Sequence, residues 1–171
     1  MVECQKCLDP TSFGLFLVAV VSLPLAIYQL LNDGSVWNMA ALFTVGGILM
    51  ICVAWLAYHA DSNFGFVVFG LVGFGVLITG LTANNTMGSY VCLTFALVYV
   101  LAFIWSIVAK TPKTLSLILV TTTLIFLTVG LSGIIGGDYW HWLIGISALL
   151  NFLFNIYLSF ALALDGKIPV V

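Results

Sequence analysis

The chain has few charged residues: among its 171 residues there is no arginine, and four lysines and six carboxylates make up only 6%. Soluble domains carry about 25% charged residues, whereas 63% of this chain is hydrophobic. This composition excludes a water-soluble globule. The net charge of −2 also argues against a nucleic-acid partner, because it offers phosphate groups little attraction.

Six long apolar runs without a charged side chain lie between these charges. They are Phe13–Leu31, Val36–Tyr58, Phe64–Leu81, Met87–Ala109, Thr114–Ile135 and Tyr139–Leu164. Each is long enough, at 1.5 Å per residue, to cross a hydrocarbon core about 30 Å thick. Lipid offers the backbone no hydrogen-bond partner, so such runs must be helices. The sequence predicts an all-α integral membrane protein with six transmembrane helices.

The lysines predict how the chain is oriented. Residues 1–12 and 165–171 form the predicted terminal segments, and 13–164 the six-helix transmembrane domain. With six spans, one face carries every lysine and the other carries only Asp33 and Asp138; the lysines are Lys6, Lys110, Lys113 and Lys167. Basic residues are retained in the cytoplasm. We therefore expect both termini to be cytoplasmic, in a multi-pass protein of the cell membrane surrounded by lipid.

No predicted span contains Asp, Glu, Lys or Arg. Pumps and ion-coupled carriers usually place such a residue inside the membrane as a relay. Its lack favours a narrow pore or facilitator for small neutral or weakly acidic solutes, and argues against a membrane-embedded enzyme. Cys4 and Cys7 form a single CxxC pair. A metal site needs about four ligands, so we expect no metal and no cofactor, although an oligomer could bring several such pairs together.

The last span carries a polar stripe with a period of four residues. Its members are Ser147, Asn151, Asn155 and Ser159. This spacing places them on one helix face. They could line a pore, or they could hydrogen-bond to other helices for under about 1 kcal/mol per contact. The glycines of the third span, such as Gly73 and Gly80, favour close helix packing over space for a solute.

Two segments resemble the acetate uptake transporter family. Gly46-Gly47 in the second span precedes Asn63-Phe64-Gly65-Phe66 and Gly73-Phe74, at spacings similar to the family's paired glycine, its N-T-F-G loop and its third helix. The segment Asp9–Leu15, DPTSFGL, resembles the family's N-P-A-P-L-G-L at the mouth of the first helix. Asn, Pro and Leu of that signature are replaced here by Asp9, Ser12 and Phe13.

The resemblance implies a homohexamer with one pore per protomer that passes acetate or another small monocarboxylate. The family narrows its pore with a Phe, a Tyr and a Leu on helices one, three and five. Counting from Pro10 and from Gly65 places the first two positions at Val18 and Val72, and the third falls near Leu119 or Val120. A neck of valines would be wider and would lack the phenol hydroxyl. The family's Gln in helix two corresponds here to Met50.

A permeation pathway follows from this resemblance. Backbone amides and hydroxyls over Pro10, Phe13 and Gly14 would hold a carboxylate at the positive end of the first helix. Apolar side chains of Val18, Phe69 and Val72 would pass the acyl tail. The remaining expected pathway residues are Val120, Asn151 and Asn155. Asp9 would repel an anion unless the protonated acid is the permeant or Asp9 serves only as a helix cap.

Other functions stay open at this point. A urea, short-amide or ammonia channel would also suit a six-span hexamer, and the amides of Asn151 and Asn155 match a neutral amide. A non-transporting membrane scaffold would use the same polar groups only for helix packing.

Overall fold

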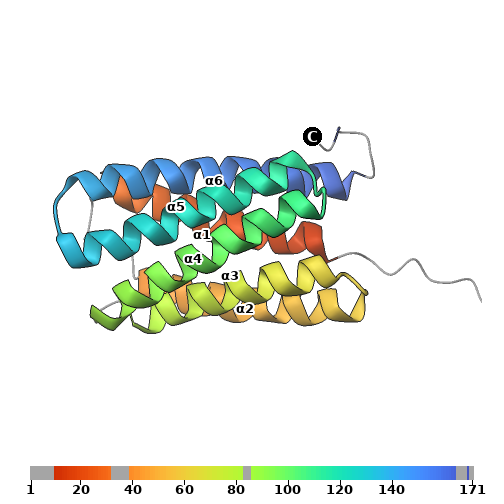
Figure 1. Cartoon of the computed structure of the whole chain (residues 1–171), viewed down its shortest axis with the longest axis horizontal. Coiled ribbons are helices and arrows are strands. Elements are labelled where there is room, and N and C mark those ends of the chain that lie inside the picture. Colours follow the sequence, from red (N-terminus) through yellow and green to blue (C-terminus); the bar gives the residue numbers. More distant parts are fainter. Residues whose placement is uncertain (1–9, 32–38, 83–85, 165–168, 170–171) are drawn as a thin grey trace, which may run out of the picture.

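The chain forms six long helices in a computed structural model that describes residues 10–31, 39–82, 86–164 and 169 (Figure 1). The helices are α1 Thr11–Leu31, α2 Met39–His59, α3 Asn63–Leu81, α4 Thr86–Val108, α5 Lys113–Ile135 and α6 Tyr139–Ala163. All six are long and apolar enough to cross a membrane. The prediction of six apolar helices is confirmed, with α1 beginning two residues before its expected start. Cys4, Lys6, Cys7, Asp9, Asp33 and Lys167 lie outside the described residues.

The helices close into a ring. Each helix packs against the next one along the chain, and α6 packs against α1. Contacts are extensive between α2 and α3, between α1 and α6, and between α4 and α5, but sparse where α1 meets α2 and where α3 meets α4. Figure 1 accordingly shows α2 and α3 together along the lower side of the bundle. This hairpin faces the other four helices across the interior of the ring.

Helices α1, α3 and α5 begin at the end of the bundle where α2, α4 and α6 finish, on the right of Figure 1. Reciprocal hydrogen bonds join α1 and α6 there: the Ser12 hydroxyl donates to the Ser159 carbonyl at 2.8 Å, and the Ser159 hydroxyl donates to the Ser12 carbonyl at 2.7 Å. Asp61 and Lys110 follow α2 and α4 with φ of 55° and 52°. This left-handed conformation ends a helix and lets the chain reverse within a few residues.

Glycines bring α2 and α3 into backbone contact. A Cβ atom on Gly47 would lie 2.5 Å from the Leu77 nitrogen and 2.7 Å from the Gly73 oxygen. On Gly80 it would lie 2.7 Å from the Thr44 nitrogen. These approaches leave no room for a side chain, so Gly73 and Gly80 of the third span serve helix packing, as the sequence favoured.

The outer surface of the ring is strongly apolar. Large side chains point outward all along the helices; examples are Leu31, Trp55, Leu97, Val108 and Trp142. Soluble monomers rarely expose apolar patches of this extent. A surface of this kind suits contact with lipid or with other copies of the chain.

Candidate functional site

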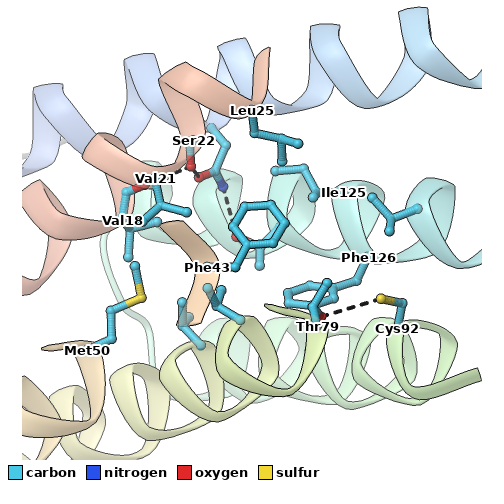
Figure 2. Close-up of a pocket in the computed structure, with 15 residues that line it drawn as sticks. Val18, Val21, Ser22, Leu25, Phe43, Met50, Thr79, Cys92, Ile125 and Phe126 are labelled. Carbon is cyan, nitrogen blue, oxygen red and sulfur yellow. Dashed lines mark hydrogen bonds between the residues drawn. The ribbon is translucent and has the colours of Figure 1, made fainter. Parts of the chain in front are cut away.

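A cavity of about 60 Å³ lies inside the ring and receives side chains from all six helices. In Figure 2, Val18 and Met50 lie toward one end of it, and Leu25 and Ile125 toward the other. The ring of Phe43 lies between these ends, and the ring of Phe126 lies beside Thr79. The lining is mostly aliphatic and aromatic and has no charged side chain. We call it the inner cavity.

A second, smaller cavity of about 20 Å³ lies toward the end of the bundle where α1, α3 and α5 begin. Its lining includes Thr11 at the start of α1, Phe64 and Gly65 in the first turn of α3, and Leu115 in the first turn of α5. Three helix N-termini, each carrying a partial positive charge, therefore surround it. We call it the outer cavity. Its lining likewise has no charged side chain.

Val18, Val72 and Thr122 line both cavities, so they form the partition between them. The two valines come from α1 and α3 and are buried. The Thr122 hydroxyl donates to the Ile118 carbonyl at 2.8 Å and accepts from the Asn151 amide at 2.8 Å. Because this hydroxyl already donates one hydrogen bond and accepts another, it is not available to a solute. The partition therefore offers a passing solute an essentially apolar surface. We call these three residues the neck.

The structure brings most of the expected pathway residues to these cavities. Phe69, Asn151 and Asn155 line one or the other, in addition to the two valines of the neck; of the two candidates on α5, Leu119 lines the outer cavity and Val120 lines neither. Val120 is one helical position, about 100°, away from the inward face.

The expected residues near the start of α1 take different positions. Phe13 is 57% exposed on the outer surface, so its side chain is turned away from the pathway. Gly14 is buried beneath Phe69, where a Cβ atom would lie 2.5 Å from the ring. Pro10 is half-buried, and its carbonyl accepts from the Gly14 nitrogen at 2.9 Å. Of these three, only Gly14 bears on the cavity, by making room for the ring of Phe69.

Asn151 is the centre of a hydrogen-bond cluster that joins α1, α5 and α6. Its side-chain oxygen accepts from the Ser22 hydroxyl at 2.9 Å. Its amide nitrogen donates to the hydroxyls of Thr121 and Thr122 at 2.9 and 2.8 Å, and to the Ile118 carbonyl at 3.3 Å. The polar stripe of α6 therefore both lines the cavities and bonds other helices. The two interpretations of the stripe are compatible.

Replacing Asn151 with alanine should lower the free energy of unfolding by about 2 kcal/mol, since four interhelical contacts are lost at about 0.6 kcal/mol each. Equilibrium unfolding in mixed detergent micelles measures this loss. Thr128→Val is the matched control, because the buried Thr128 hydroxyl bonds only carbonyls of its own helix. A loss no larger than that of the control would contradict the structural role of the cluster.

Several lining residues were not expected from the sequence. Phe43, Val76 and Phe126 line the inner cavity, and Leu15 lines the outer one. They are ordinary apolar residues among apolar neighbours, so no pattern distinguishes them. Met50, noted only as a departure from the family's Gln, is fully buried and lines the inner cavity. Among the residues that the structure describes, no cluster of His, Cys, Asp or Glu could hold a metal.

No protein-family model and no curated protein matches the sequence. Among solved structures, the fold matches that of the bacterial acetate channel SatP, with a TM-score of 0.83 and 18% sequence identity over 95% of this chain and 98% of that one. Over the residues that the structure describes, the chain is therefore all-α, with six membrane-capable helices in the arrangement of that channel. The expected resemblance to the acetate uptake transporter family is confirmed in the fold, in a divergent sequence.

Proposed function

We propose that this chain is a membrane channel or facilitator for acetate or a similarly small monocarboxylate. The observation that carries the proposal is the pair of cavities in series, separated by Val18 and Val72, inside the fold of an acetate channel. Two apolar cavities on either side of one partition mark out the path that a short acyl solute would take through the ring. The absence of charged side chains from both linings fits passive passage better than an ion-coupled pump.

Capture of the solute takes place at the outer cavity. The N–H groups in the first turn of a helix point along its axis, out of its N-terminal end, and favour negative charge, and α1, α3 and α5 all begin beside this cavity. The Ser12 hydroxyl is committed to Ser159, so backbone amides, rather than this hydroxyl, attract the carboxyl group. Lys110 and Lys113, both exposed at the same end, add positive charge to the approach.

The neck then selects by size and polarity. Val18 and Val72 occupy the positions where the resembled family has Phe and Tyr, and together with the hydrogen-bonded Thr122 they leave a wider and essentially apolar passage. We infer that the neck admits acyl chains somewhat longer than that of acetate. Larger or strongly hydrated solutes are excluded, because water is poorly held between aliphatic walls.

A short neutral amide is the second candidate solute, since the amides of Asn151 and Asn155 line the cavities. We further propose that the protein lies in the cell membrane with both termini in the cytoplasm, and that it assembles as a homohexamer with a pore in each protomer. The proposal for orientation is supported by Lys110 and Lys113, which lie at one end of the bundle, where α4 leads into α5. The proposal for assembly rests on the family resemblance.

Flux into reconstituted vesicles tests the proposed function. Vesicles of phosphatidylcholine with and without the protein are exposed to labelled acetate, propionate, urea and methylammonium, and initial uptake is compared. We expect acetate and propionate uptake well above that of empty vesicles. Uptake of urea alone would indicate an amide channel instead. Uptake of none of these solutes would favour a non-transporting scaffold.

A further inference from the structure

The inner cavity is the one of the two cavities that can hold a whole short acid. Its volume of about 60 Å³ has room for about four to six water-sized groups, since each takes about 10–15 Å³. That is the size of acetate or propionate. The outer cavity, at about 20 Å³, has room for about one or two such groups, which is too little for a complete acid. A solute that has passed the neck therefore rests in the inner cavity.

The neck sorts solutes by cross-section and not by chain length. Unbranched acyl chains have the same width whatever their length, so a passage between Val18 and Val72 that admits a short chain admits a longer one as well. A limit on length has to come from the space behind the neck, where the whole chain must fit. The side chain that ends this space decides the longest acid that the protein accepts.

The ring of Phe43 lies within this space. Figure 2 shows it between the end of the inner cavity marked by Val18 and the end marked by Leu25. Phe43 and Met50 are about two turns apart on α2 and share its inward face. Phe43 also packs against both groups of buried side chains, the large one that contains Val18 and a small one that contains Leu25. Its ring thus occupies the length of the cavity that a longer acyl chain would need.

Phe126 lines the same cavity but is held differently. Its ring stacks on that of Tyr99, with centroids 5.4 Å apart and planes at 14°, and lies 5.6 Å from the ring of Phe95. Within the part of the chain that the structure describes, Phe43 has no ring partner of this kind, and its side chain is only half-buried. Phe126 therefore belongs to the wall of the cavity, whereas the ring of Phe43 can be exchanged without breaking a stack.

We propose that Phe43 determines the longest acyl chain that the protein transports. This inference rests on the proposed function and names the residue that sets its substrate range. The inner cavity takes acetate and propionate, and the ring of Phe43 excludes unbranched acids with longer tails. The resembled family places aromatic side chains at the neck; in this chain the aromatic size filter lies one step further along the pathway, on α2.

Phe43→Ala tests the proposal through the ratio of butyrate uptake to acetate uptake. Phosphatidylcholine vesicles with purified protein receive one or the other labelled acid, and uptake into empty vesicles is subtracted for each. A hydrophobic pocket discriminates by about tenfold or more for one methylene group, so we expect the ratio to rise at least about tenfold above that of the wild type. Leu49→Ala is the control, because Leu49 lies on the same helix but is 45% exposed on the outer surface and lines neither cavity. It should keep the wild-type ratio.

The opposite substitution, Phe43→Trp, keeps the test valid if the alanine variant does not fold. The larger ring shortens the cavity, so propionate uptake should fall about tenfold relative to acetate uptake. An unchanged ratio in either variant, measured on monodisperse protein, would overturn the inference and leave the channel assignment intact. Wild-type uptake of butyrate equal to that of acetate would contradict it in the same way. Absence of acetate uptake by the wild-type protein would instead overturn the proposed function itself.

Discussion

Replacing Val72 with tryptophan should reduce acetate uptake to the level of empty vesicles. Val72 lines both cavities, so a large side chain at this position fills the passage between them rather than one cavity alone. The cavity space on either side of Val72 receives part of the indole ring, so we expect a packing cost within the range of about 1–3 kcal/mol that is typical of overpacked cores. The variant should therefore fold and fail to conduct. Uptake by purified protein in vesicles is the measurement.

Val67→Trp is the matched control for this substitution. Val67 lies on the same helix, α3, but is 37% exposed on the outer surface and lines neither cavity. It should conduct like the wild-type protein. If Val72→Trp conducts equally well while remaining folded, the neck lies elsewhere, and the two cavities are not steps of one pathway.

Gly47→Ala is expected to lower the free energy of unfolding by about 3 kcal/mol, at the upper end of overpacking costs. The added methyl group would lie 2.5 Å from the Leu77 nitrogen and 2.7 Å from the Gly73 oxygen. Both are backbone atoms, so no change of side-chain rotamer relieves the contact, and α2 and α3 must separate. Detergent-induced unfolding of the two proteins gives the difference.

Gly70→Ala provides the comparison within the same hairpin. A Cβ atom on Gly70 would meet only the Ala54 Cβ, at 3.8 Å, which is an ordinary contact. Alanine is also favoured over glycine in a helix by about 1 kcal/mol. This variant should be as stable as the wild type or slightly more so. Equal destabilisation by both substitutions would mean that α2 and α3 are not held together by close backbone approach.

The six helices could be predicted from the sequence because two independent constraints act together. Charges are confined to the turns, and apolar runs of this length have no alternative to helix in lipid. The predicted limits agree with the observed helices to within a few residues. The largest difference is in α2, which begins at Met39 rather than Val36, and the intervening residues lie outside the described part of the chain.

The pathway could be predicted only where something other than hydropathy marked the inward face. Val18 and Val72 were predicted to line the pathway because they lie at the same distances from Pro10 and Gly65 as the neck residues of the resembled family. Asn151 and Asn155 were predicted because polar residues recur every four positions in the last span. On α5, three consecutive threonines and a continuous apolar sequence give no such marker. Neighbouring residues on a helix point in directions about 100° apart. Choosing between Leu119 and Val120 therefore meant choosing which side of α5 faces inward. Only the packing of α5 against α4 and α6 decides it.

The pairing of α1 with α6 has a consequence for how the protein is made. The first helix finds extensive contacts, and partners for its Ser12 and Ser22 hydroxyls, on the last helix. A nascent chain that lacks α6 therefore has an open ring and a polar α1 face without its partners. Synthesis of the final helix closes both gaps at once. The conduit proposed here is therefore enclosed only after α6 has been made, and chains truncated before α6 lack it.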